Sequence, residues 1–335
     1  MSPDAPRVSV LLPVKDAACT LLECLASLRA QSLRDHEVVA VDDGSSDGSS
    51  ALLARAAALD PRVRVLSSDG PGLVAALNTC LRAARGRFLA RMDADDLAHE
   101  ERLRLQVAAL ERVVAPGILG TRVTVLGGSA NAGMHAYVEW SNRLVDDAAI
   151  RRDLFVESPL VHPSVMMRAE VLRDLGGYRD YDGPEDYDLW LRAAAAGVRF
   201  AKLEEPLLLW RDSPGRLTRK DPRYGPERFR ARKVEALVRG PLAGREVVLW
   251  GAGKIGKAWA RELGARGVHV LAFVEVDPRK LGQRIHGAPV VDVAKGSVLE
   301  GALHLAAVGQ PGARERIRAE ARRHGLSDAH LVAVA

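Results

Sequence analysis

The sequence predicts an α/β fold in two successive domains, and three observations support this. Short apolar runs alternate with stretches of helical periodicity through the first two-thirds of the 335 residues. From about residue 214 a stretch rich in Pro, Gly and Arg interrupts the pattern, and a new strand–glycine–helix pattern follows it. We therefore expect one domain over residues 1–212, a basic linker over 213–243 and a smaller domain over 244–335.

The elements of the first domain follow in order from the apolar pattern. Leucines between Leu21 and Leu28 recur at helical spacing, and residues 72–84 predict a second helix. We expect the first strand to end at Pro13. Strands separated by helices pair in parallel through right-handed crossovers, so their carboxyl ends share one edge of the sheet. Buried strands are expected at residues 8–12, 38–41, 63–66 and 87–92.

The second domain repeats the strand–helix alternation on a smaller scale. A strand at 246–250 leads through glycines into a helix that ends near residue 265. Further strands are expected at 268–274, 302–308 and 331–334, with a basic helix over 313–324.

Composition excludes several classes of protein. Aromatic residues make up only 4%, too few for the stacking surfaces of a nucleic-acid-binding protein. The three cysteines, Cys19, Cys24 and Cys80, lack metal-ligand spacing, so we expect reduced thiols. We find neither a signal peptide nor an apolar run that could span a bilayer, and we expect a cytoplasmic protein.

The stretch 211–243 carries 10 basic and 4 acidic residues. It can be a solvated linker of helix and loop. Alternatively, it can contact anionic lipid head groups, which would place the protein peripherally at the inner face of the membrane.

Two acidic clusters follow predicted strands. Asp93 and Asp95 stand one residue apart after the fourth strand, where they would point into a binding crevice. Such a pair is costly unless a cation neutralises it, and a divalent ion bound to a diphosphate is a natural partner. Asp43 follows the second strand, where a carboxylate can accept hydrogen bonds from a pyrimidine N–H or a ribose hydroxyl.

Taken together, an ordered set of motifs resembles the family 2 glycosyltransferases of the GT-A fold. The set covers roughly residues 7–212, and its members are the segments 8–14, 42–47, 92–96, 99–103, 162–166, 176–178 and 185–192. This resemblance implies an inverting transferase that moves a sugar from a nucleoside-diphosphate donor, such as a UDP-sugar, to a hydroxyl of a glycan or lipid-linked acceptor. It also implies a setting in polysaccharide or glycoconjugate assembly.

The resemblance implies a role for individual residues of this chain. Asp43 would contact the nucleobase, Pro13 would lie in the substrate site, and Asp93 would approach the ribose or the metal. Asp95 would bind Mg²⁺ or Mn²⁺, which bridges the two phosphates. Asp186 would be the catalytic base, with Glu185 beside it in the substrate site.

The residues themselves leave two of these assignments open. Asp186 and its acidic neighbours can equally form the first turn of a helix, where carboxylates are favoured by the helix dipole. His162 can be a metal ligand presented to the diphosphate by a His-Pro-Ser turn, or a hydrogen-bonded turn residue.

The second domain carries a dinucleotide fingerprint, Gly251, Gly253 and Gly256, between a strand and a helix. Glu275 ends the next strand, where an acidic residue can hold a ribose. The segment resembles small Rossmann-like modules appended to sugar-metabolising enzymes, so NAD(P) or another nucleotide is a candidate ligand. The glycines can also simply shape a tight turn. Two rival functions therefore remain: an NAD(P)-dependent oxidoreductase acting through this domain, and a non-catalytic nucleotide-sugar sensor.

Overall fold

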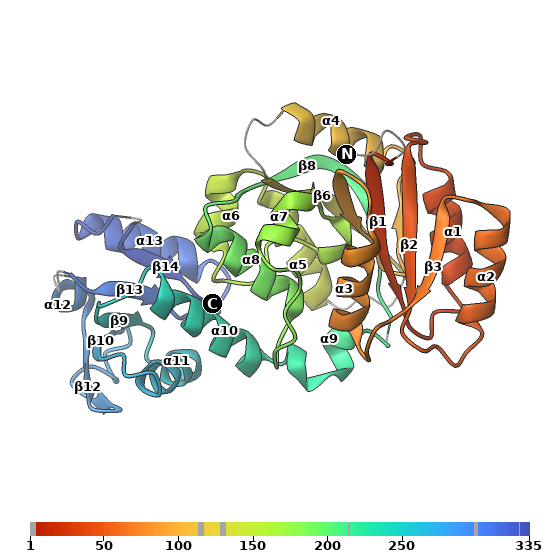
Figure 1. Ribbon diagram of the computed structural model, residues 1–335. Helices are drawn as coiled ribbons and strands as arrows, with labels where there is room; N and C mark the ends of the chain where they lie inside the picture. The colour runs from red at the N-terminus through yellow and green to blue at the C-terminus, as the bar shows by residue number, and fades with distance from the viewer. Residues whose placement is uncertain (1–4, 113–116, 128–131, 214, 298–300, 328) are drawn as a thin grey trace. The chain divides into compact units, whose positions relative to one another are not determined.

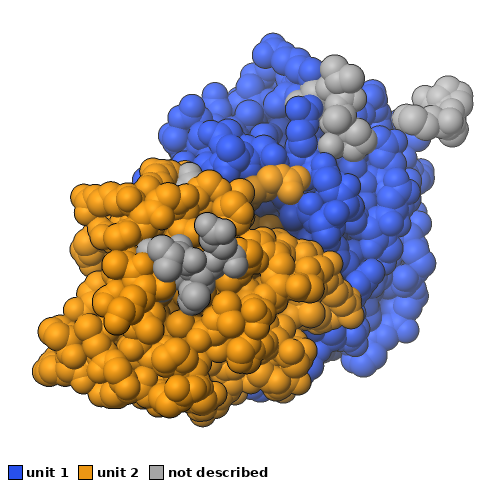
Figure 2. All heavy atoms as spheres, turned by 90° about the vertical axis from the view of Figure 1, so that its left-hand side faces the viewer, with its two compact units in different colours: residues 1–150, 159–222 blue, residues 151–158, 223–335 orange. Residues whose placement is uncertain are grey.

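The computed structural model describes residues 5–112, 117–127, 132–213, 215–297, 301–327 and 329–335. The chain forms two compact units, the first of residues 1–150 and 159–222, the second of 151–158 and 223–335 (Figure 2). Residues 223–243, which the sequence analysis placed in a linker, thus belong to the second unit, and so does the short segment 151–158.

The first unit is built on an eight-stranded sheet of order β3-β2-β1-β4-β7-β6-β8-β5 (Figure 1). The strands of this sheet are β1 (Val8–Val14), β2 (His36–Asp42), β3 (Val63–Ser67), β4 (Phe88–Arg91), β5 (Leu97–Ala98), β6 (Gly117–Leu126), β7 (Met166–Arg168) and β8 (Arg199–Arg211). The helical elements that lie wholly within this unit are α1 (Leu21–Arg29), α2 (Ser49–Leu59), α3 (Leu73–Ala83), α4 (Arg102–Arg112), α5 (Ala132–Arg143), η1 (His162–Ser164), α7 (Ala169–Asp174), α8 (Glu185–Ala195) and α9 (Leu217–Lys220). Residues of both units occur in α6 (Asp147–Asp153) and η2 (Pro222–Tyr224).

The strands β1 to β4 form the parallel half of this sheet, as the alternating pattern predicts. Helices α1 and α2 cover one face of the sheet and α3 covers the other (Figure 1). The strands β1, β2 and β3 are added in one direction across the sheet, whereas β4 is added on the opposite side of β1, so the strand order reverses between β3 and β4. This reversal leaves a crevice position between the carboxyl ends of β1 and β4, where α/β sheets bind ligands. Every residue of β1 and β4 is buried.

The first strand continues through Pro13 to Val14, so the expectation that Pro13 ends it is wrong. Val14 offers its carbonyl to the Asp43 N–H on the β2 side, so Pro13 faces the β4 side. On that side the last bond runs from the Met92 N–H to the Leu11 carbonyl. The missing N–H of Pro13 therefore breaks no ladder bond.

The antiparallel half of the sheet extends the crevice. β7 runs antiparallel to both β4 and β6, and β6 pairs in parallel with the long strand β8. The register of β6 on β8 shifts around Arg122, which curves the pair. As a result, the end of β8 at Arg211 lies against the loop that follows β4.

The second unit contains a six-stranded sheet of order β11-β12-β10-β9-β13-β14, parallel except for β11. Its central strand β9 is buried throughout, because apolar clusters lie on both faces of the sheet. Its elements are α10 (Pro226–Arg239), β9 (Val247–Trp250), α11 (Lys254–Gly264), β10 (Val270–Val274), β11 (Arg284–Ile285), β12 (Ala288–Val291), α12 (Val293–Ser297), β13 (Leu303–Ala306), α13 (Ala313–Arg323) and β14 (Leu331–Ala333).

The segment 151–158 is anchored inside the second unit by polar and apolar contacts. Asp153 is buried and pairs with Arg318 at 2.8 Å, and the Lys233 ammonium donates to the Val156 carbonyl at 2.7 Å. Phe155 packs against the apolar cluster around β9. Among the helices that the structure describes, none is long and apolar enough to cross a membrane.

Candidate active site

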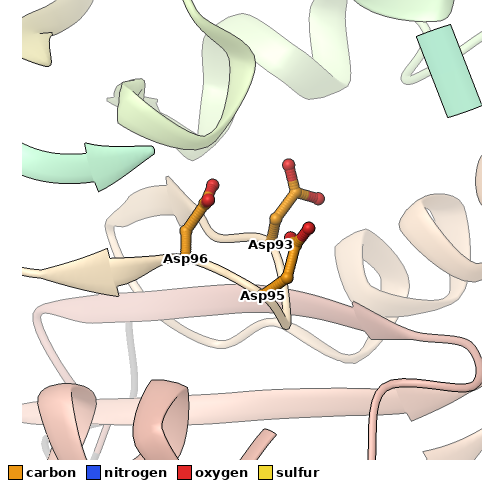
Figure 3. Close-up of side chains that lie close together, drawn as sticks. All are labelled: Asp93, Asp95 and Asp96. Carbon is orange, nitrogen blue, oxygen red and sulfur yellow. The ribbon is translucent and has the colours of Figure 1, made fainter. Parts of the chain in front are cut away.

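Three carboxylates gather at the loop that follows β4. Asp93, Asp95 and Asp96 each offer an oxygen, and these oxygens lie within 4.8 Å of one another (Figure 3). Asp96 is only 1% exposed; its Oδ1 accepts the Arg211 N–H at 2.7 Å, whereas its Oδ2 is buried without a hydrogen-bond partner. Within the described residues this is the one group of three or more acidic, His or Cys side chains that is close enough to hold a metal ion.

The electrostatics of this acidic group are unbalanced. Burial, together with the charge of Asp93, raises the pKa of Asp95 to about 6. Burial, together with the charges of Asp93 and Asp95, raises the pKa of Asp96 well above its ordinary value. Burial also opposes ionisation of Asp93, but the Arg91 guanidinium, 2.6 Å from Oδ1, together with His162 and Arg216, lowers the pKa of that carboxyl. Arg91 forms its ion pair with Asp93, and the pKa values of Asp95 and Asp96 remain raised, so an added cation would be stabilised there.

The loop that carries these acids is held by backbone contacts from distant elements. The Arg211 Nε donates to the Asp95 carbonyl at 2.7 Å, and the buried Arg102 donates to the Arg91 carbonyl at 2.8 Å. Arg216 stacks on Trp210, 3.9 Å from the ring centroid, and its charge lowers the pKa of Asp95. These arginines fix the loop, and Arg216 partly neutralises it.

Asp43 lies two strands away from Asp93 along the same edge of the sheet. Its two carboxylate oxygens accept the Gly72 N–H at 3.0 and 3.1 Å. Gly72 has φ of +94°, which favours glycine, at the position preceding α3. The Lys15 ammonium donates to the carbonyls of Asp43 and Gly44 at 2.8 and 2.7 Å. Asp43 and the buried Pro13 thus lie at adjacent strand ends.

His162 is buried, and both of its ring nitrogens face side chains. Nε2 lies 3.0 Å from the Tyr178 hydroxyl, and Nδ1 lies 3.5 Å from Glu185 Oε1. Burial and the charge of Arg91 lower the pKa of His162, which favours the neutral ring. The acidic group that can hold a metal does not include this histidine.

Glu185 and Asp186 begin helix α8, in the first turn where the helix dipole favours carboxylates. Glu185 is buried, while Asp186 is half-buried and its Oδ1 accepts the Tyr187 N–H at 2.7 Å. Arg192 binds Asp188 and donates to the Leu175 and Gly177 carbonyls at 2.5 and 2.9 Å. The role of Arg192 is therefore to hold α8 against the turn that precedes Tyr178.

The glycine loop of the second unit is tightly packed at two of its three glycines. A Cβ on Gly251 would lie 2.5 Å from Val308, and one on Gly256 would lie 1.9 Å from the Gly251 carbonyl oxygen. A Cβ on Gly253 would meet nothing within 4 Å. The Glu275 carboxylate accepts the Ala252 N–H at 3.2 Å and pairs with Lys280 at 2.8 Å. Glu275 thus binds the glycine loop itself.

Sequence reasoning assigned no definite role to three residues of the first-unit site. Asp96 directly follows the predicted pair and carries the unpartnered oxygen. Arg91 is a lone arginine in an apolar strand, which is itself a signal for a buried partner. Asn78 donates to the Tyr178 carbonyl at 2.8 Å and accepts the Tyr178 N–H at 3.0 Å, a pairing that only the fold reveals.

Known proteins match this chain in both sequence and fold. The model of glycosyl transferase family 2 matches residues 9–176. The putative glycosyltransferase EpsE of Bacillus subtilis (strain 168) is 32% identical over 224 residues, which are 65% of this chain and 78% of that protein. The amylovoran biosynthesis glycosyltransferase AmsE of Erwinia amylovora is 31% identical over 205 residues, 60% of this chain and 74% of that one.

Two solved structures share the fold at low identity. TarS of S. aureus, in complex with UDP-GlcNAc, superposes with a TM-score of 0.58 at 17% identity, covering 77% of this chain and 71% of that chain. The mannosyltransferase PcManGT of Pyrobaculum calidifontis, in complex with GDP-Man and Mn²⁺, gives 0.50 at 23% identity, covering 70% and 62%. The mixed α/β sheet, the acidic edge and these matches agree: the chain belongs to glycosyl transferase family 2 and is a transferase enzyme of the GT-A type.

Proposed function

We propose that this chain is a metal-dependent, inverting glycosyltransferase that uses a nucleoside-diphosphate sugar, with a UDP-sugar as the first candidate. The observation that carries the proposal is the group of Asp93, Asp95 and Asp96, three carboxylates with one unpartnered buried oxygen. Leaving a buried carboxylate oxygen unpaired is costly, and a cation relieves that cost.

The donor set fits Mg²⁺ or Mn²⁺. All of its ligands are carboxylate oxygens, which these hard ions prefer, and Asp95 and Asp96 are the residues with raised pKa values. In such a site the ion acts as a Lewis acid that offsets the negative charge on a departing diphosphate. The sequence also predicts His162 as a ligand, but its contacts with Tyr178 and Glu185 favour a different role.

In the proposed reaction the acceptor hydroxyl oxygen attacks the anomeric carbon of the donor sugar. Asp186 takes the hydroxyl proton, the new glycosidic bond forms, and the bond from the anomeric carbon to the phosphate oxygen breaks with its electron pair on the nucleoside diphosphate. Asp43 contacts the nucleobase, Pro13 lies in the substrate site, and Asp93 approaches the ribose or the metal. Glu185 belongs to the same substrate site.

The relatives support the kind of substrate. The fold neighbours are described with UDP-GlcNAc in one case and with GDP-Man and Mn²⁺ in the other. AmsE is described as an enzyme of amylovoran biosynthesis. We propose polysaccharide or glycoconjugate assembly as the setting, with a glycan or lipid-linked acceptor.

We further propose that the second unit is a Rossmann-like module whose glycine loop can bind a nucleotide. The open space beside Gly253, where a Cβ would meet no atom within 4 Å apart from those of Gly253 and its two chain neighbours, supports this. Isothermal calorimetry of the full chain with NAD⁺, NADP⁺, UDP and ADP tests it. If none of the four nucleotides binds, the proposal is contradicted and the glycines serve only to shape a tight turn.

A membrane contact through 211–243 stays a prediction. Several cations of this stretch already have protein partners: Arg219 pairs with Asp212, Arg232 with Glu235, and the Lys233 ammonium with a carbonyl. Flotation with anionic liposomes tests the contact, since a chain that stays at the bottom of the gradient would contradict it.

The test of the main proposal is hydrolysis of a panel of nucleotide sugars with Mn²⁺, comparing the native chain with Asp95→Ala. We expect one nucleoside diphosphate to be released by the native chain and none by the variant, because slow donor hydrolysis needs the same acidic group. Glu101→Ala is a matched control, since Glu101 is paired with Arg104 outside the acidic group. Equal release by the native chain and Asp95→Ala would overturn the proposal.

A further inference from the structure

A buried chain of side chains connects helix α3 to the start of α8. The Asn78 side chain holds the backbone of Tyr178 with two hydrogen bonds of 2.8 and 3.0 Å. The Tyr178 hydroxyl meets His162 Nε2 at 3.0 Å, and His162 Nδ1 faces Glu185 at 3.5 Å. Glu185 directly precedes Asp186, so the chain ends beside the proposed base.

The directions of the hydrogen bonds follow from the surroundings. Burial keeps the Tyr178 hydroxyl protonated by raising its pKa, and burial with Arg91 favours a neutral His162. A protonated phenol next to a neutral ring donates to Nε2, which places the ring proton on Nδ1. That N–H then points at the Glu185 carboxylate, so the two ring nitrogens of His162 have distinct partners.

The packing around this chain is close and leaves little freedom. Gly177 has φ of +71°, and a Cβ there would lie 2.7 Å from the Asn78 Oδ1, so the turn before Tyr178 accepts only glycine without rearrangement. The His162 ring meets Trp190 edge-on, with centroids 5.9 Å apart. Arg192 secures α8 to the same turn through two carbonyls.

We infer that Asn78, Tyr178 and His162 are positioning residues, which hold the first turn of α8 through Glu185 and thereby orient Asp186 toward the acceptor. This inference rests on the proposed function and assigns His162 a role other than metal binding. A shift of about 1 Å in a reacting group costs about 100-fold in rate, so loosening this chain should lower turnover. It should leave the acidic group after β4 unchanged.

The first experiment separates positioning from metal binding. Tyr178→Phe removes only the phenol oxygen, and we expect kcat for transfer to fall about tenfold or more, with the donor KM and the Mn²⁺ affinity within twofold of native. Tyr224→Phe, a half-buried tyrosine of η2, is the matched control and should transfer at the native rate. An unchanged kcat in Tyr178→Phe would overturn the inference.

Two substitutions of His162 separate its two contacts. Asn places an amide near the position of Nδ1, toward Glu185, whereas Gln reaches the position of Nε2, toward Tyr178. We expect His162→Asn to retain more kcat than His162→Gln, with native Mn²⁺ affinity in both. A loss of Mn²⁺ affinity in both variants would overturn the inference and restore His162 as a ligand. Melting curves of both variants identify any that fail to fold, and Tyr178→Phe then decides.

A readout without turnover keeps this inference separate from the proposed function. In ¹⁵N NMR of the native chain at about pH 7, with His162 assigned by the His162→Asn variant, we expect a protonated Nδ1 and an unprotonated Nε2. The opposite tautomer would overturn the inference even in an active enzyme. An inactive chain with the expected tautomer would instead contradict the proposed function alone.

Discussion

Both units of this protein place acidic residues after a strand of a sheet, but these acids differ in their hydrogen-bond partners. In the first unit the Asp96 Oδ2 has no partner and the pKa of Asp95 is raised to about 6. In the second unit Glu275 accepts the N–H groups of Ala252, Val276 and Asp277 and pairs with Lys280. Burial opposes its ionisation, but those bonds lower the pKa of Glu275.

This difference shows that an acidic residue at the end of a strand can either belong to a cation-binding site or stabilise a neighbouring loop. Acids that lack protein partners pay a desolvation cost that a ligand cation can relieve, so the cost itself favours binding. An acid that is already hydrogen-bonded gains little from a ligand. The acidic edge of the first unit is therefore prepared for a cation, whereas Glu275 first stabilises its own glycine loop.

The largest expected effect comes from Asp186. Replacing it with Asn removes the proposed base and should lower kcat for transfer by about 1,000-fold, since general base catalysis contributes between about 100- and 10,000-fold. Donor affinity measured by calorimetry should stay within twofold, because Asp186 acts on the acceptor. Transfer at a rate near that of the native chain would place the base elsewhere.

The next effect tests the comparison of the two acids directly. Asp95→Asn should weaken Mn²⁺ binding at least tenfold, as loss of a metal-site group does, whereas Glu275→Gln should leave Mn²⁺ affinity unchanged. Glu275→Gln should instead lower the free energy of unfolding of the second unit by about 0.5–1.5 kcal/mol, because it weakens hydrogen bonds that are only partly buried. Titration calorimetry and denaturant unfolding measure the two quantities. A similar loss of Mn²⁺ affinity in both variants would contradict the proposed difference between Asp95 and Glu275.

The glycine loop offers a matched pair of substitutions. Gly251→Ala brings a Cβ to 2.5 Å from Val308 at φ of +109°, and should lower the free energy of unfolding by about 1–3 kcal/mol. Gly253→Ala meets open space and should change it by less than about 0.5 kcal/mol. Denaturant unfolding followed by tryptophan fluorescence compares them. If a nucleotide binds here, Gly253→Ala should weaken its binding while the fold stays intact.

The smallest expected effect is on pH dependence. Burial and the neighbouring Asp93 raise the pKa of Asp95 to about 6, so protons and Mn²⁺ compete for this group. Mn²⁺ affinity should fall by up to about tenfold per pH unit below about pH 6. In the metal-free protein the same group contributes stability that is fully present below about pH 4 and is lost as pH rises through about 6. Calorimetric Mn²⁺ titrations between about pH 5 and 8 test the competition, and an affinity that does not vary with pH would contradict the raised pKa.

The sequence by itself determined the alternating α/β pattern of the parallel strands and the acidic pair Asp93 and Asp95. It also predicted the family through the order of its motifs. These features are local: an apolar run buries as a strand, and two acids one residue apart after a strand end remain together in any such fold. Pro13 shows the limit of local rules, since only its neighbours decide whether a proline ends a strand.

Only the tertiary structure decided which polar groups are satisfied. Arg211 reaches Asp96 across 115 residues of sequence, and Asn78 reaches Tyr178 across 100. The partners of His162 and Glu275 likewise depend on how separate strands and helices meet. Hydrogen bonds between distant segments follow no periodic pattern in the sequence. The residue types therefore identify candidate site residues, and only the folded structure shows which groups they contact.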